Sequence, residues 1–118
     1  MKLDHVSLNV ADRPRSIEWY REVLGLEPRS EAKQDDWPVF MGDVVALFQA
    51  ASPAPERDSE TAGLRHFAFG VGAQELKRVK GQLGEKGVRF NAEDHGNAHS
   101  VYFRDPDSNT IEFTTYEV

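Results

Sequence analysis

The feature that most constrains this chain is a strand pattern that occurs twice. Residues 3–10 (LDHVSLNV) alternate apolar and polar side chains, and residues 64–71 (LRHFAFGV) alternate in the same phase, 61 residues further on. Because successive side chains of a strand point to opposite faces, each segment carries one histidine, His5 or His66, on its less apolar face. The sequence therefore predicts a fold built from two copies of one unit.

Each of these predicted strands is followed by a helix and then by further strands. Apolar residues at helical spacing predict one helix between Asp12 and Gly25 and a second over residues 74–84, with Gly87 closing it. Each half then ends in a hairpin, with strands at 37–41 and 44–49 in the first half and at 100–103 and 110–116 in the second. A further strand is predicted at residues 88–91, and residues 27–36 are expected to be loop or edge strand.

The order of these elements predicts an α+β fold made of two βαβββ modules, residues 1–49 and 63–118. A module this short cannot bury the face of its sheet alone, so the two modules must pair. Residues 50–62 (AASPAPERDSETA) are rich in small residues, proline and charge, which is typical of a linker. At 118 residues the chain is expected to form a single domain.

A carboxylate, Glu112, lies in the middle of the last predicted strand between Ile111 and Phe113. Such a residue faces either water or a cation. Two predicted strands thus carry one histidine each on the less apolar face, and a third carries one glutamate on the corresponding face. That set needs a common explanation.

Composition excludes several classes of function. The net charge of −6 repels phosphate backbones and anionic membranes, and the chain has no basic run, so nucleic acid is not an expected partner. The absence of cysteine excludes disulfides, thiolate ligands and a cysteine nucleophile. No run approaches the ~20 apolar residues of a membrane span, and the first ten residues indicate a strand rather than a signal peptide. A cytoplasmic location is expected.

The two strand histidines, the late glutamate and the Asp105-Pro106-Asp107 turn together resemble the vicinal oxygen chelate superfamily. This superfamily includes glyoxalase I, fosfomycin-resistance thiol transferases, bleomycin-resistance proteins and extradiol ring-cleaving dioxygenases, and the resemblance covers essentially the whole chain. It implies a cupped, barrel-like mixed sheet with the helices outside, often with modules exchanged between the chains of a homodimer. It also implies a metal ion held by His5, His66 and Glu112.

The chemistry of these side chains supports the implied metal site. Neutral imidazole and carboxylate are ligands for Fe(II), Mn(II), Zn(II) or Ni(II), and two histidines with one carboxylate leave positions open for substrate or O₂. We expect Fe(II) or Mn(II) first. The glyoxalase I pattern has a further glutamate in the first half, where this chain has Ala46, so a three-ligand site is favoured over glyoxalase I chemistry. Ser108 stands where the family's turn commonly has glycine, and Asn109 is expected to take the positive φ.

The resemblance to the dioxygenases extends to the residues before Glu112. Tyr102 precedes it by ten residues, and the loop with His95 and His99 resembles the loop that carries an acid/base histidine in those enzymes. His95, His99 and Tyr102 are therefore the candidate catalytic residues. By strand phase, four residues are expected to line a pocket for a small substrate that chelates the metal through vicinal oxygens: Ser7, Phe48, Ala68 and Tyr102.

Two other functions remain open. A fosfomycin-resistance-type thiol transferase is compatible with Ser7, which matches the hydroxyl residue two positions after the first metal histidine of that group. A protein of the bleomycin-resistance type would bind a drug or metabolite without chemistry. The sequence leaves open the substrate, the metal, the role of each loop histidine, and whether His5 meets its partners within one chain or across a dimer.

Overall fold

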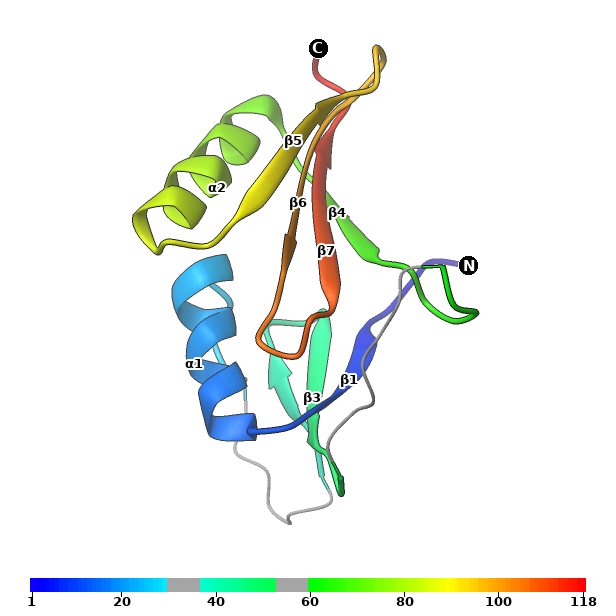
Figure 1. Ribbon diagram of the computed structural model, residues 1–118, viewed down its shortest axis with the longest axis vertical. Coiled ribbons are helices and arrows are strands. Elements are labelled where there is room, and N and C mark those ends of the chain that lie inside the picture. Colours follow the sequence, from blue (N-terminus) through cyan, green and yellow to red (C-terminus); the bar gives the residue numbers. More distant parts are fainter. Residues whose placement is uncertain (30–36, 53–59) are drawn as a thin grey trace. The chain divides into compact units, whose positions relative to one another are not determined.

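A computed structural model of the chain describes residues 1–29, 37–52 and 60–118 (Figure 1). The fold is α+β, as predicted, and divides into two units, Met1–Pro55 and Glu56–Val118, which are described one at a time. Most of the expected loop or edge strand at 27–36, and residues 53–59 of the predicted linker, lie outside the described residues.

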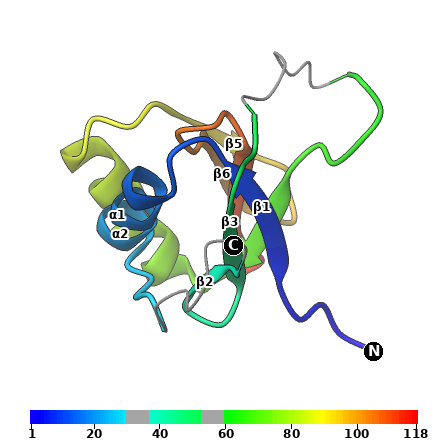
Figure 2. The same ribbon diagram turned by 90° about the horizontal axis from the view of Figure 1, so that it is seen from below.

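The first unit contains a three-stranded mixed sheet with the order β1-β3-β2. Strand β1 (Val6–Val10) pairs in parallel with β3 (Val45–Gln49), and β2 (Val39–Met41) pairs with β3 in the antiparallel sense. Helix α1 (Arg13–Leu24) packs on β2 and β3 and lies to one side of this sheet in Figure 2. The helix therefore covers one face of the sheet, and the residues of the alternate phase occupy the other face.

Both ends of α1 follow from local sequence. The Asp12 carboxylate accepts a hydrogen bond from the N–H of Arg15, which satisfies one of the free donors at the helix start. Gly25 ends the helix with φ of +69°, a conformation that a residue without Cβ adopts at little cost. Tyr20, one of the residues at the predicted helical spacing, is completely buried.

The second unit repeats this plan with one more strand, in the order β4-β7-β6-β5. Strand β4 (Phe67–Gly70) pairs in parallel with β7 (Thr110–Thr115), and β6 (His99–Arg104) joins β7 to β5 (Phe90–Asp94) by antiparallel pairing. Helix α2 (Ala73–Glu85) packs on β6 and β7 through the buried residues of its predicted apolar face. These are Leu76, Val79 and Leu83.

The turn between β6 and β7 is organised by one carboxylate. Asp105 accepts hydrogen bonds from the backbone N–H groups of Asp107 and Asn109 and from the Asn109 side-chain amide. The positive φ falls on Ser108, at +66°, so the prediction that Asn109 would take it was wrong. Asn109 is held by two hydrogen bonds to Asp105, and the preceding residue makes the left-handed turn at a cost of roughly 1 kcal/mol.

The strand registers of the two units correspond position by position. In each unit the last strand lies between two partners. The first strand pairs with it in parallel, and the strand that precedes it in the chain pairs with its other edge in the antiparallel sense. The two central rows of cross-strand neighbours are Ser7–Ala46–Phe40 and Ala68–Glu112–Tyr102. The repeat predicted from the sequence is therefore present in the pairing of the strands.

Candidate functional site

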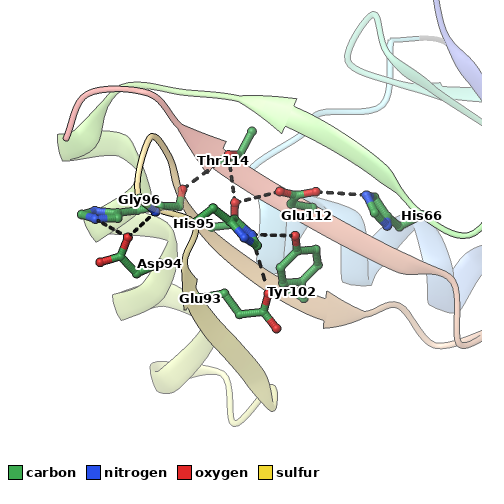
Figure 3. Close-up of polar contacts among 10 residues, drawn as sticks. His66, Glu93, Asp94, His95, Gly96, Tyr102, Glu112 and Thr114 are labelled. Atoms are coloured by element: carbon green, nitrogen blue, oxygen red, sulfur yellow. Dashed lines mark hydrogen bonds and ion pairs between the residues drawn. The ribbon is translucent and has the colours of Figure 1, made fainter.

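The residues of interest in the second unit lie on the face of the sheet opposite α2. Glu112 on β7 has Ala68 of β4 on one side and Tyr102 of β6 on the other. In the next row, Ser100 of β6 is paired with Thr114 of β7. Since side chains two residues apart on a strand share a face, these five residues lie on one face of the sheet. Figure 3 labels three of them, Tyr102, Glu112 and Thr114.

Glu112 is buried and paired with a histidine. Its side chain is 11% exposed, and its Oε1 lies 3.0 Å from Nε2 of His66, which directly precedes β4. Among the described residues, no lysine or arginine forms an ion pair with this carboxylate, and no third histidine, aspartate or glutamate joins it and His66 to form a cluster. Burial of a carboxylate is costly without a partner, and here the partners are the His66 ring and the Ser100 hydroxyl.

The 3.0 Å contact between His66 and Glu112 is an ion-pair distance that is also compatible with two ligands of one metal ion. In octahedral coordination, adjacent nitrogen and oxygen ligands at about 2.1 Å from the ion subtend a right angle and lie about 3.0 Å apart. The donor set, one imidazole and one carboxylate, also suits first-row divalent metals. The two residues therefore fit the metal site that the sequence predicts.

Two hydroxyl groups position the Glu112 carboxylate. Ser100 Oγ donates a hydrogen bond to Oε2 at 2.7 Å, and the Thr114 hydroxyl lies 2.9 Å from Ser100 Oγ. Ser100 is 2% exposed, so water does not compete for these contacts. With Oε2 held in this way, Oε1 is directed toward His66. Ser100 was not among the predicted site residues, although its spacing of two residues from Tyr102 places it on the same face.

Tyr102 connects this pair to the loop between β5 and β6. Its ring meets the His66 ring edge-on, with centroids 5.7 Å apart, and its hydroxyl oxygen lies 3.2 Å from Nε2 of His95 (Figure 3). Burial, followed by the negative charge of Glu112, raises the pKa of Tyr102 above its ordinary value. The phenol therefore keeps its proton at neutral pH and can donate a hydrogen bond. His95 Nε2 is also 3.6 Å from a carboxylate oxygen of Glu93.

The two loop histidines lie on different sides of the sheet. His99 is the first residue of β6 and alternates with Ser100, so its side chain faces away from Glu112 and toward the α2 side. Its Nε2 is 3.5 Å from a carboxylate oxygen of Asp94. Of the two candidate acid/base residues, the structure brings His95 next to Tyr102 and does not bring His99 there.

The first unit has the same arrangement without the carboxylate. His5 directly precedes β1, its ring lies edge-on to Phe40 with centroids 5.2 Å apart, and its Nδ1 is 2.7 Å from an oxygen of Asp4. Ala46, 1% exposed, occupies the position that Glu112 has in the second unit. Because the units are described separately, convergence of His5 with His66 and Glu112 stays a prediction.

The predicted pocket residues are also divided between the units. Ser7 is exposed on β1 beside Ala46, and Phe48 is half-buried on β3 on the same face. Ala68 is exposed on β4 beside Glu112. Each lies on the sheet face that its strand phase predicted, and a shared pocket stays a prediction.

Comparison with known proteins identifies a family. Residues 2–113 match the model of the Glyoxalase/Bleomycin resistance protein/Dioxygenase superfamily. The chain is 33% identical over 116 residues to biphenyl-2,3-diol 1,2-dioxygenase 3 of Rhodococcus globerulus, covering 94% of this chain and 61% of that protein. It is 26% identical over 113 residues to glutathione transferase FosA of Serratia marcescens, covering 93% of this chain and 77% of that protein.

A solved structure has the same fold. The glyoxylase/bleomycin resistance protein/dioxygenase domain from Frankia sp. EAN1pec aligns with a TM-score of 0.84 and 22% identity, covering 98% of this chain and 92% of that one.

Among the described residues, neither helix has the length and apolar character needed to cross a bilayer.

Proposed function

Because the chain belongs to the Glyoxalase/Bleomycin resistance protein/Dioxygenase superfamily, we propose that it is a small metal-dependent enzyme. Its substrate would chelate the metal through two neighbouring oxygens, and His5, His66 and Glu112 would hold Fe(II) or Mn(II) in preference to Zn(II) or Ni(II). The observation that carries the proposal is the buried Glu112 carboxylate, whose Oε1 lies 3.0 Å from Nε2 of His66 while its other oxygen is held by Ser100.

The neighbouring side chains have distinct parts in this proposal. A bound divalent metal supplies a Lewis acid that lowers the pKa of a coordinated substrate hydroxyl. Tyr102, protonated at neutral pH, would donate a hydrogen bond to a substrate oxygen, and His95 Nε2 would accept and return a proton. The small Ala68 side chain leaves room beside Glu112, and Ser7 and Phe48 would contact the rest of the substrate.

Within the family, we favour chemistry like that of the dioxygenases. The contact of 3.2 Å between His95 Nε2 and the Tyr102 hydroxyl supports it, because it combines a group that can move a proton with one that can orient a substrate oxygen. The likeness to glutathione transferase FosA makes a thiol transferase the second candidate. A binding protein without catalytic activity is the third.

Metal content is the first test. We expect the purified protein to bind about one Mn(II) or Fe(II) per chain, and His66→Ala and Glu112→Gln to weaken binding by at least about 100-fold, since even partners that only orient a ligand contribute 10- to 100-fold. Glu85→Gln, which removes an exposed carboxylate from the end of α2, is the matched control. Metal occupancy that is unchanged in both site variants would show that the ligand set is misassigned.

Substrate panels then separate the three candidates. Oxygen uptake with substituted catechols would support the dioxygenase-like reaction, and formation of a glutathione adduct with fosfomycin would support the transferase. Tight ligand binding with no turnover on either panel would favour a binding protein.

The source of the third ligand can be tested in the homodimer that the resemblance implies. If the site forms across two chains, mixing His5→Ala and His66→Ala proteins should restore about a quarter of the sites, because half of the dimers are mixed and each has one intact site. If the site forms within one chain, the mixture stays inactive. Light scattering of the wild-type protein tests the dimer itself.

A further inference from the structure

Two arginine residues, Arg89 and Arg104, line one depression on the second sheet. Arg104 follows Tyr102 by two residues on β6 and is paired with Thr110 on β7. Phe90, the first residue of β5, is paired with Phe103, so Arg89 and Arg104 each lie one residue beyond this pair, at the same end of it. Both arginines are exposed, and neither has an acidic partner among the described residues.

A structural role does not explain this arrangement. Two like charges held close together repel each other, which costs free energy. The chain has 20 acidic residues against 14 basic ones, so carboxylates are available, yet none is among the described residues that line this depression. An oxyanion held between the two guanidinium groups would remove the repulsion, and arginine suits carboxylate and phosphonate groups because it can donate two parallel hydrogen bonds.

The arginine pair opens onto the same hollow as Tyr102. A depression of about 560 Å³ is lined by Arg89, Asn91, Tyr102, Arg104 and Thr110, together with apolar neighbours of β5 and β6. This volume is within the range of small-ligand sites. Two residues along a strand span about 7 Å, so the arginines are one small-molecule length from the Tyr102–Glu112 row.

We propose that Arg89, Arg104 and Thr110 form a subsite for an oxyanion on the substrate. The inference rests on the proposed function, because it takes the vicinal oxygens of the same molecule to be held near Glu112 and Tyr102. The substrate class is then a vicinal-oxygen compound with a carboxylate or phosphonate about 7 Å from its chelating oxygens. The two arginines select this class by charge, and the Thr110 hydroxyl adds a hydrogen-bond donor.

Calorimetric binding of four probes tests the subsite. These are catechol, 3,4-dihydroxyphenylacetate, its primary amide and 3,4-dihydroxybenzylphosphonate, each titrated with and without Mn(II). We expect the acid to bind about tenfold more tightly than the amide at low salt, with the difference shrinking as salt rises. Arg89→Gln/Arg104→Gln should remove the difference, and the charge-matched Lys77→Gln/Lys80→Gln, on exposed positions of α2, should keep it.

The outcomes separate this inference from the proposed function. If Mn(II) binds but the acid and the amide bind equally, the subsite is overturned and the metal site stands. If Mn(II) does not bind, the proposed function fails, and the acid-to-amide ratio of the metal-free protein still tests the arginines. An equal loss in the lysine variant would reduce the effect to net charge and overturn the proposal. Tighter binding of the phosphonate than of the carboxylate, or the reverse, identifies which oxyanion the subsite takes.

Discussion

The two halves of this protein share a backbone plan and differ in the side chains of one sheet face. Each half has a histidine directly before its first strand, and each histidine ring meets an aromatic ring edge-on, Phe40 in the first half and Tyr102 in the second. Where the second half has a carboxylate, Glu112, the first has Ala46. The halves therefore share the alternation that gives the fold, and they differ in the buried carboxylate, which the second half has and the first half lacks at the equivalent position.

The largest expected effect comes from giving the first half the carboxylate that it lacks. Ala46 is 1% exposed, so Ala46→Glu adds volume and a buried charge and should lower the free energy of unfolding of the metal-free chain by about 3 kcal/mol. Added Mn(II) should restore much of this loss if the new carboxylate reaches the same ion. Urea denaturation with and without metal measures both effects.

Ala46→Gln is the control for this experiment because it adds nearly the same volume without the charge. We expect it to be destabilised with and without Mn(II). If metal rescues neither variant, the added carboxylate does not reach the ion, and the equivalence of Ala46 and Glu112 is one of fold alone.

A smaller effect is expected from removing the hydroxyl that holds Glu112. Ser100→Ala leaves the buried Oε2 without its donor, which should lower stability by about 1–2 kcal/mol and weaken metal binding by about tenfold. Thr115→Ala is the matched control, since Thr115 is 1% exposed, lies on the opposite face and accepts a hydrogen bond from the Glu117 N–H. Equal loss of metal affinity in both variants would assign Ser100 a purely structural role.

The order of the elements could be predicted because it depends on local patterns. Alternation of apolar and polar residues predicts the strands. Apolar residues spaced three and four apart predict both helices, and glycine indicates where each helix ends. Strand limits were less accurate. The first and fourth strands begin three residues later than predicted, at Val6 and Phe67, which leaves His5 and His66 at the strand entrances.

The site could be predicted only as far as strand phase reaches. Phase alone placed His66, Ala68 and Glu112 on one face. It could not separate His95 from His99, because the turn between them depends on Gly96 with φ of +84° and on hydrogen bonds within the loop. Contacts of a hydroxyl with a chosen carboxylate oxygen are set by rotamers and burial, which a pattern of residue types does not contain.

A pH-dependent effect is expected from making the second half resemble the first. The ordinary pKa of tyrosine is 10.0, and that of Tyr102 is raised in the folded chain. The unfolded chain therefore loses this proton first, so the contribution of Tyr102 to stability is full below pH 10.0 and falls as pH rises above it. We expect the difference in unfolding free energy between wild type and Tyr102→Phe, measured without metal from pH 8 to 11.5, to fall as pH rises. The control variant Phe40→Tyr keeps Tyr102, so the contribution of Tyr102 should still fall over this range.

The smallest effect concerns a feature that the halves share. Each helix carries one Glu–Arg pair three residues apart, Glu18–Arg21 on α1 and Glu75–Arg78 on α2. A hydrogen bond from Arg78, together with its charge, lowers the pKa of Glu75, so the pair contributes stability above the ordinary value of 4.5 and loses it as pH falls through the lower folded value. Arg78→Gln should lower the free energy of unfolding by less than about 0.5 kcal/mol at pH 7 because both side chains are exposed.

Arg21→Gln should change stability in the same direction, measured by urea denaturation at pH 7 and pH 3. Losses that persist unchanged at pH 3 would show that the arginine stems pack on the helix rather than pair with the glutamates, and a large loss in one helix alone would mean that the halves differ beyond their site faces.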